Sequence, residues 1–262
     1  MFDPLFQLAH IAGNRDQPGG QASRPVHRDA LVQQAWDAVK CIDLDRARES
    51  MTVFDDKFTG ARAAYIERAG QSATIVFRTT MTLHDVLHDF DMRQTRFIGD
   101  ARVHRGFCRK YLSLRDRLHA IVLERAPAHI LLCGHSLGGA LACMAAVDLH
   151  TCFEDVEIDV VTFGAPRAGN LAFTQQLKRA AHRYVRVRDR LDLIPDMPGT
   201  MLGFTHGFGE RPCSLHNFIA RFLNSLFVFV ARPTSHHFNH FHDYYDDALR
   251  ARRLVTDESR NS

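Results

Sequence analysis

The chain has 262 residues, of which 45% are hydrophobic, and its 33 Lys and Arg against 30 Asp and Glu give a formal net charge of +3. Because the basic residues are scattered among acidic ones, the composition excludes the concentrated basic face of a nucleic-acid-binding protein, and we expect no nucleic-acid partner. No stretch approaches the roughly 18 apolar residues that span a bilayer, so we expect no transmembrane segment.

The beginning of the chain predicts a flexible N-terminal segment over residues 1–26, because residues 13–26 are rich in glycine, proline and polar side chains. We expect residues 27–262 to form a single domain. Residues 1–5 show no basic region followed by an apolar run, so the sequence as written has no secretory signal. We therefore expect a cytoplasmic location, or export by a route without a visible signal peptide.

Helices and strands alternate along this domain. A helix is predicted over about 29–40, where Leu31, Ala35 and Val39 share one side. The other predicted elements are strands at 61–67, 73–78, 158–163 and 184–188 and helices at 107–124 and 171–181. Alternation of this kind predicts an α/β fold with a mainly parallel central sheet and helices on both faces.

The most informative segment is a tight turn at 134–139, Gly-His-Ser-Leu-Gly-Gly, which joins an apolar run to a run of small residues. The pattern predicts a strand that enters a helix through a strained turn, with the hydroxyl of Ser136 held out from the sheet. Gly134 and Gly138 are expected because any side chain there would collide with the neighbouring strand or helix. Ser136 is therefore predicted to be a nucleophile at a helix N-terminus, which favours negative charge.

The cysteine and histidine patterns do not indicate a metal site. The six cysteines show no Cys-x-x-Cys spacing, and Cys133 and Cys143, on either side of the serine turn, are predicted to be small buried apolar residues. Four histidines crowd residues 236–242, but without paired carboxylate or cysteine spacing we expect no metal there.

Three further segments occur in order with the serine turn and give the chain a family resemblance. They are Phe77-Arg78-Thr79-Thr80, Val103-His104-Arg105-Gly106-Phe107 and the phrase Thr162-Phe163-Gly164-Ala165-Pro166-Arg167-Ala168-Gly169-Asn170. Together with residues 134–139 they resemble the class 3 lipases, over residues 60–250 or so. The resemblance implies an α/β-hydrolase fold, cleavage of lipid esters through an acyl-enzyme, and a Ser-His-Asp triad that needs no cofactor and no metal.

The acid of such a triad follows the nucleophile along the chain. Asp192 is our first choice because it lies just beyond the predicted strand 184–188, and because the family carries its acid before two apolar residues and a proline, as in Asp192-Leu193-Ile194-Pro195. Asp189 is the second choice. The alternative for Asp192 is an ordinary carboxylate that caps a turn.

The general base is expected on a loop before the final helix, for which residues 243–249 are the prediction. The family register of a histidine, a tyrosine five places later and then Ala-Leu selects His240, and His242 is the alternative base. His206 and His216 are expected at the surface or in a lid.

Two donors are expected to hold the oxyanion of the tetrahedral intermediate. One is the backbone N–H of Leu137, the residue after the nucleophile. The resemblance implies that Thr80 supplies the other, since it follows the position of the family's Arg-Gly pair. Thr79 replaces the expected glycine of that pair, and the alternative is that both threonines are ordinary strand-end residues.

Enzymes that act on insoluble esters often cover the site with an amphipathic segment. An apolar stripe within residues 215–230 is expected to form a lid or lipid-contacting helix, with burial in the core as the alternative. Residues 83–90 carry a shorter stripe, at the place where the fungal members of the family have their lid.

The sequence thus predicts a serine hydrolase that cleaves carboxylic esters of lipids, similar to a triacylglycerol lipase, with a lipid ester as its partner at a lipid–water interface. A phospholipase A1 or a short-chain carboxylesterase would use the same triad with another acyl pocket. A binding protein that keeps the fold without the chemistry is the other alternative, and the set Ser136, Asp192 and His240 weighs against it.

Overall fold

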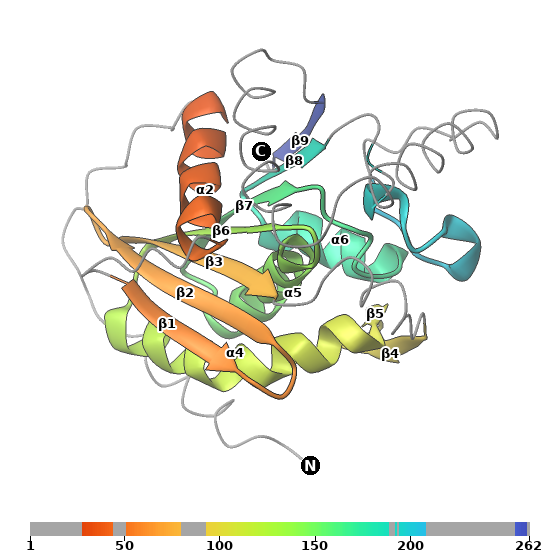
Figure 1. Ribbon diagram of the computed structural model, residues 1–262, viewed down its shortest axis with the longest axis horizontal. Helices are drawn as coiled ribbons and strands as arrows, with labels where there is room; N and C mark the ends of the chain where they lie inside the picture. The colour runs from red at the N-terminus through yellow and green to blue at the C-terminus, as the bar shows by residue number, and fades with distance from the viewer. Residues whose placement is uncertain are drawn as a thin grey trace, which may run out of the picture.

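A seven-stranded mixed sheet forms the centre of the computed structural model (Figure 1), which describes residues 28–43, 51–79, 93–188, 192, 194–207 and 255–260. The strands, in their order across the sheet, are β1 (Met51–Asp56), β2 (Ala61–Arg68), β3 (Ser72–Thr79), β6 (His129–His135), β7 (Glu157–Phe163), β8 (Arg183–Arg188) and β9 (Val255–Arg260). The four strands β3, β6, β7 and β8 run parallel, whereas β1, β2 and β9 join by antiparallel pairing.

The parallel core agrees with the prediction, and the antiparallel strands complete it at both edges. The strands β2 and β3 were predicted, while β1 and β9 were not. The strands of the core are buried because they carry near-continuous apolar runs, as in Ile130–Cys133, where every side chain is fully buried.

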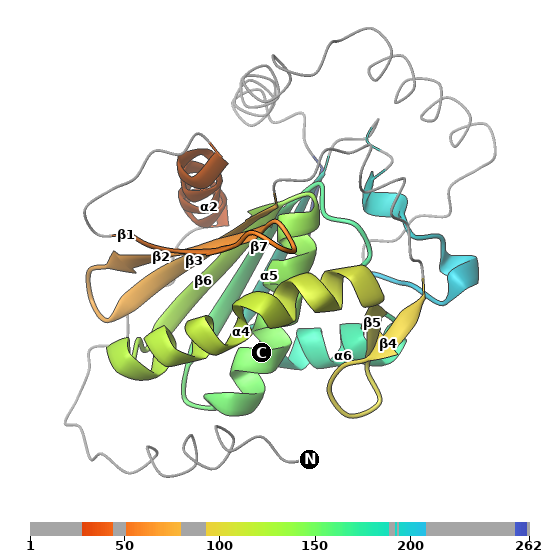
Figure 2. The same cartoon turned by 60° about the horizontal axis from the view of Figure 1, so that its bottom comes forward.

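Helices cover both faces of this sheet (Figure 2). On one face lies α2 (Arg28–Asp43), and on the other lie α4 (Arg105–Arg125), α5 (Leu137–Cys152) and α6 (Leu171–Ala180). Two separate apolar clusters result, because successive side chains of a strand point to opposite faces. In β6, Leu131 and Cys133 pack with α2, while Ile130 and Leu132 pack with α4 and α5.

The helix predicted over about 29–40 is confirmed, and its apolar side is buried. Leu31, Ala35 and Val39 are all buried, and Trp36 beside them packs its ring 4.9 Å from that of Phe163 in β7. The apolar stripe of α2 therefore closes the face of the sheet that the other helices leave open.

A small hairpin of β4 (Gln94–Arg96) and β5 (Arg102–His104) lies beside the N-terminus of α6 (Figure 2). Asn170 caps α6 by accepting a hydrogen bond from the Phe173 N–H at 3.0 Å, and the same oxygen accepts from the Arg102 N–H at 3.0 Å. One side chain thus starts the helix and ties it to β5.

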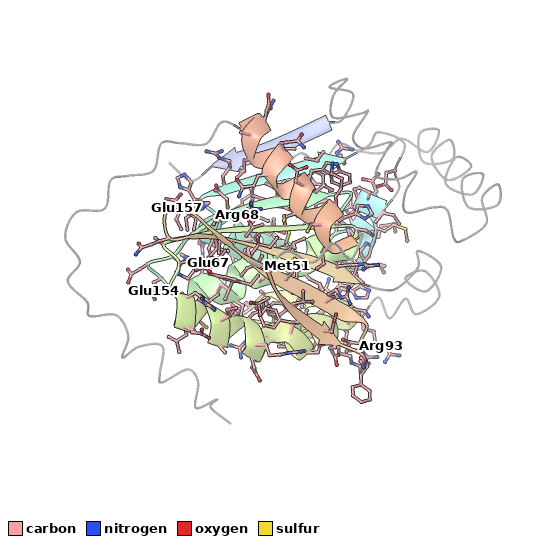
Figure 3. All side chains as sticks on the ribbon, turned by 60° about the vertical axis from the view of Figure 1, so that its left-hand side comes forward. Met51, Glu67, Arg68, Arg93, Glu154 and Glu157 are labelled. Atoms are coloured by element: carbon pink, nitrogen blue, oxygen red, sulfur yellow. The ribbon has the colours of Figure 1, made fainter. Side chains whose placement is uncertain are left out.

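The two ends of the parallel strands differ in character. Figure 3 shows Arg68, Glu154 and Glu157 together at the end where β7 begins, with Arg93 on the far side of the molecule. The opposite, carboxyl end of these strands contains the serine turn. In open α/β sheets this end is where ligands bind.

Candidate active site

Ser136 occupies the strained turn that its sequence predicted. It stands between the last residue of β6 and the first of α5, with φ of 51° and ψ of −125°, a conformation that residues with a side chain rarely adopt. Its side chain is half-buried, and its N–H donates to the carbonyl oxygen of Phe163 at 2.8 Å. The strain is therefore held in place by the neighbouring strand.

The glycines of the turn are required by close backbone approach, as predicted. A Cβ on Gly134 would lie 2.4 Å from the carbonyl carbon of Gly138, and a Cβ on Gly138 would lie 2.2 Å from the carbonyl oxygen of Phe77. On Gly139 it would meet the Cβ of Ala165 at 2.7 Å. No L side chain fits at these distances, so the turn closes only with glycine.

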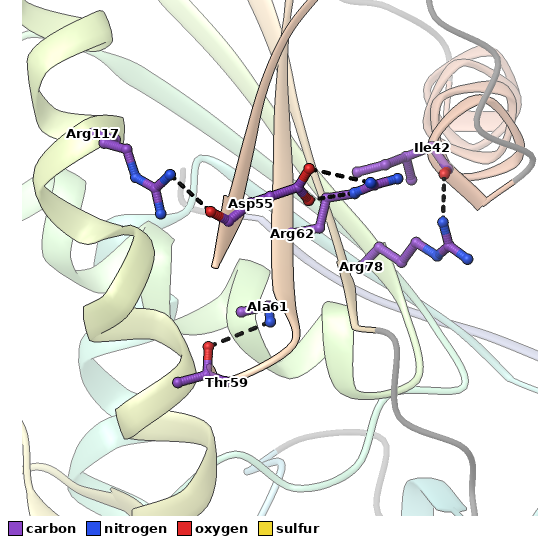
Figure 4. Close-up of polar contacts among 7 residues, drawn as sticks. All are labelled: Ile42, Asp55, Thr59, Ala61, Arg62, Arg78 and Arg117. Atoms are coloured by element: carbon purple, nitrogen blue, oxygen red, sulfur yellow. Dashed lines mark hydrogen bonds and ion pairs between the residues drawn. The ribbon is translucent and has the colours of Figure 1, made fainter. Parts of the chain in front are cut away.

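The end of β3 lies against the start of α5 for the same reason. Phe77 is the last residue of β3 that pairs with β6, opposite Gly134, and β3 ends two residues later at Thr79. Arg78, between them, donates from Nη1 to the carbonyl oxygen of Ile42 at 3.1 Å and thereby ties this strand end to the C-terminus of α2 (Figure 4). Helix carbonyls of a last turn lack partners within the helix, so they attract cations.

The other contacts of Figure 4 fasten the neighbouring hairpin of β1 and β2. Arg62 on β2 donates from Nη2 to the Asp55 carboxylate on β1 at 3.1 Å, and Arg117 on α4 donates to the carbonyl oxygen of Asp55 at 2.9 Å. These bonds hold the outer hairpin to α4, and β3 is in turn held by the hairpin.

Leu137 is the first residue of α5, so its N–H has no acceptor within the helix and faces the N-terminal end. This is the position predicted for an oxyanion donor. Thr80, the second predicted donor, follows the last residue of β3 and lies outside the described residues.

Asp192 lies on the connection between β8 and the short 3-10 helix η1 (Ile194–Asp196). Its carboxylate is half-buried and accepts a hydrogen bond from the Ile194 N–H at 2.9 Å through Oδ1. The turn-capping contact foreseen as the alternative is thus present. Asp189, the second choice, lies outside the described residues.

The register of the parallel strands brings the nucleophile and the acid loop to one edge of the sheet. His135 pairs with Phe163, and Phe163 pairs with Val187. Ser136 therefore follows β6, and the connection to Asp192 follows β8, at the same carboxyl end of the sheet, with β7 between the two strands.

Several predicted residues lie outside the part of the chain that the structure describes. These are the bases His240 and His242, His216, the final helix 243–249, the stripes 83–90 and 215–230, and the N-terminal segment 1–26. The assignments made for them remain predictions.

The expectation for His206 was wrong. Its side chain is only 6% exposed, and Nε2 donates to the carbonyl oxygen of Pro195 at 2.7 Å. Burial, followed by the nearby charge of Arg186, holds the pKa of His206 well below its usual value. Sequence reasoning missed its burial because a lone histidine in a glycine-rich loop carries no periodic signal.

Among the residues that the structure describes, one group could offer ligands to a metal ion. Nitrogen, oxygen and sulfur atoms of His119, Asp148 and Cys152 lie within 4.8 Å of one another. Asp148 Oδ2, however, already accepts from Arg115 Nε at 2.9 Å and from the Tyr111 hydroxyl at 2.5 Å. The group is therefore best described as an ion-pair network that joins α4 to α5.

The cysteines beside the serine turn are buried, as predicted. Cys133 and Cys143 are at most 3% exposed, and burial raises the pKa of both thiols, that of Cys143 to about 11. Both are therefore unreactive thiols that pack as small apolar groups.

Comparison with known proteins agrees with this geometry. The family model of lipase (class 3) matches residues 74–202, which include the serine turn and Asp192. Over these residues the chain resembles the class 3 lipases. It is 27% identical over 198 residues to a lipase from Rhizopus niveus, covering 71% of this chain and 50% of that protein. A secreted mono- and diacylglycerol lipase from Malassezia restricta is 28% identical over 145 residues, covering 50% of this chain and 48% of that protein.

The fold is shared with solved lipases. The crystal structure of a lipase from Rhizopus microsporus var. chinensis aligns with a TM-score of 0.60 at 22% identity, covering 66% of this chain and 70% of that one. This likeness confirms the α/β-hydrolase fold that the resemblance implied. The chain spans about half the length of the curated relatives it matches. In the described part of the chain, no helix has the length and apolar content to cross a bilayer.

Proposed function

We propose that this class 3 lipase relative hydrolyses carboxylic esters of lipids through an acyl-enzyme on Ser136. The observation that carries the proposal is the strained backbone of Ser136 between β6 and α5, closed by Gly134 and Gly138. Such a turn costs about 1–3 kcal/mol, and strain of this kind persists where it serves function.

The proposed reaction begins when Ser136 Oγ attacks the carbonyl carbon of the ester and its proton passes to the imidazole of His240, or of His242 in the alternative. Asp192 orients that imidazole and stabilises its charge. The oxyanion is held by the Leu137 N–H and by Thr80. The imidazole returns its proton to the departing alcohol, which leaves the acyl group on Ser136.

Water then completes the cycle. It attacks the acyl carbonyl while the same imidazole takes one of its protons, and the tetrahedral intermediate expels Ser136 Oγ, which regains that proton. The products are a free fatty acid and the alcohol. Every group in this sequence is a side chain or backbone N–H of the protein, so the mechanism needs no cofactor or metal.

We propose further that the substrate is met at a lipid–water interface and that residues 215–230 form the lid or lipid-contacting helix. The apolar residues of this stretch recur at helical spacing and are opposed by polar residues, which supports the assignment. The secreted description of the Malassezia relative supports export of this chain over a cytoplasmic location.

The test combines covalent labelling with a substrate panel. A fluorophosphonate probe should label the wild-type protein, with loss of fluoride as Ser136 Oγ bonds to phosphorus, and should not label Ser136→Ala. Ser72→Ala is the matched control, because Ser72 begins β3 at the opposite end of the sheet.

Hydrolysis of emulsified long-chain triglyceride, phospholipid and soluble butyrate ester should be measured on the same preparations. Triglyceride turnover that depends on Ser136 supports the proposal. Turnover of phospholipid or butyrate alone would select a phospholipase A1 or a short-chain esterase, and labelling of Ser136→Ala equal to wild type would reject Ser136 as nucleophile.

A further inference from the structure

The segment 194–198, which follows Asp192, is held by two buried side chains from elsewhere in the fold. Arg167, 7% exposed, donates from Nη1 to the carbonyl oxygens of Asp196 and, at 3.0 Å, of Pro198. His206, 6% exposed, donates to the carbonyl oxygen of Pro195 at 2.7 Å. Three backbone carbonyls within four residues are thereby fixed by side-chain donors.

The backbone of Arg167 reinforces the same contact. Its N–H donates to the carbonyl oxygen of Met197 at 2.7 Å, and its Nη2 lies 3.8 Å from Oδ1 of Asp196. A guanidinium suits this task because it presents several N–H donors in a rigid plane and stays charged when buried.

The anchored segment in turn contacts Asp192. The Ile194 N–H donates to Asp192 Oδ1 at 2.9 Å, so the position of this carboxylate follows the position of the segment that Arg167 and His206 hold. Among the described residues, Asp192 itself lies outside the helices and strands. The 3-10 helix η1 is only three residues long, and such a short element depends on outside contacts.

The chain just before Arg167 also contacts the nucleophile. Four residues earlier, the carbonyl oxygen of Phe163 accepts the Ser136 N–H at 2.8 Å, and the Gly164 N–H donates to Val187 in β8 at 2.8 Å. Residues 163–167 therefore touch the serine turn at one end and the acid loop at the other. A segment with both contacts sets the spacing between these two loops.

We propose that Arg167 and His206 are positioning residues, which act through segment 194–198 to hold Asp192 in place relative to Ser136. The inference rests on the proposed role of Asp192 as the triad acid. Neither residue is assigned a contact with substrate. Their effect on the reaction is transmitted through the carboxylate, and a displacement of about 1 Å in such a group can cost about 100-fold in rate.

The experiment is a double-mutant cycle on a soluble butyrate ester, with kcat and KM measured separately. Arg167→Met removes the donors and keeps the aliphatic stem, and Arg167→Lys restores a cation with a different shape. Asp192→Asn removes the carboxylate charge, and Arg179→Met on the exposed side of α6 is the matched control.

If Arg167 acts through Asp192, Arg167→Met lowers kcat about 10- to 100-fold with KM within twofold, and Arg167→Lys recovers part of the loss. In the Asp192→Asn background the same change then has little further effect, because there is no carboxylate left to position. The acid limb of the kcat/KM profile also moves to lower pH in Arg167→Met, since a displaced carboxylate no longer favours the charged imidazole.

Full additivity of the two losses, or an unchanged kcat in Arg167→Met, overturns the inference. If Arg167→Met does not fold, Arg167→Lys and His206→Phe replace it in the same double-mutant cycle with Asp192→Asn. An active Asp192→Asn would instead contradict the proposed triad, and this outcome is distinct because it concerns Asp192 alone.

Discussion

A side chain at Gly138 would place its Cβ 2.2 Å from the carbonyl oxygen of Phe77. This contact joins the first turn of α5, where the Leu137 N–H lies, to the end of β3, where Arg78 and Thr79 lead toward Thr80. The Leu137 N–H and the end of the strand that precedes Thr80 are thus brought together by a backbone approach that only glycine permits.

The first prediction concerns this approach. Gly138→Ala should lower the free energy of unfolding by about 3 kcal/mol and reduce fluorophosphonate labelling of the remaining folded protein, since backbone must move to admit the methyl group. Urea denaturation and the labelling rate measure the two effects. Gly199→Ala is the control, because a Cβ there meets nothing within 4 Å and should change neither quantity.

The second prediction concerns the strain at Ser136. Ser136→Gly should be inactive yet more stable than wild type by about 1 kcal/mol, because glycine adopts a φ of 51° without strain. Ser136→Ala should be equally inactive without the gain. Chemical denaturation of the three proteins distinguishes them, and a Ser136→Gly protein no more stable than Ser136→Ala would argue against stored strain.

The third prediction concerns the ion-pair network around Asp148, which we expect to support folding rather than the reaction. Burial would raise the pKa of Asp148, but the hydrogen bonds from His119, Arg115 and Tyr111 outweigh it and lower that pKa. Asp148→Asn should therefore lower the unfolding free energy by about 2–3 kcal/mol, since it leaves the half-buried guanidinium of Arg115 without its anion.

Its effect on labelling of Ser136 in folded protein should be small, because Asp148 lies about 18 Å along α5 from the serine turn. Exposed Asp155→Asn is the control. An intact stability with lost labelling would show that the network serves the site directly.

The fourth prediction concerns pH. Burial lowers the pKa of His104 to about 4, so its folded form stays neutral between pH 6.5 and 4 while its unfolded form binds a proton. The unfolded state therefore gains protons as pH falls, and stability falls with it, by up to about 1.4 kcal/mol per pH unit for this group.

The pKa of His206 is also lowered, so this residue likewise makes the folded state less stable as the pH falls. Urea denaturation at pH 7.5, 6.5, 5.5 and 4.5 should show this slope, and His104→Asn should reduce it while keeping a cap acceptor for the Phe107 N–H. An unchanged slope in the variant would assign the pH dependence to other groups.

The fifth prediction concerns the interface. The double variant Phe222→Ser, Leu223→Ser should lose activity on emulsified triglyceride about tenfold or more while keeping most activity on a soluble ester, since each apolar side chain contributes to lipid contact. Asn224→Ser, on the polar side of the same stretch, should change neither. Equal losses on both substrates would refute the interfacial role of residues 215–230.

The strands and helices of the core were predictable because their signals are local. Periodic apolar residues gave α2 and α4 within a few residues of their observed ends, and short apolar runs gave β6 and β7. The edge strand β1 was not predicted, because its exposed and buried residues follow no clear alternation. It is a strand because it pairs with β2, and such pairing depends on residues distant in sequence.

By itself, the sequence determined the serine turn. A strand, two obligatory glycines and a helix start are adjacent along the chain, so their geometry is encoded locally, and Ser136 lies in the backbone conformation they predict. Only the tertiary structure decided that Arg167 and His206 are buried and hold the loop after Asp192. Those contacts join residues 11 to 31 positions apart, and the packing of separate strands, rather than any periodicity, brings such groups together.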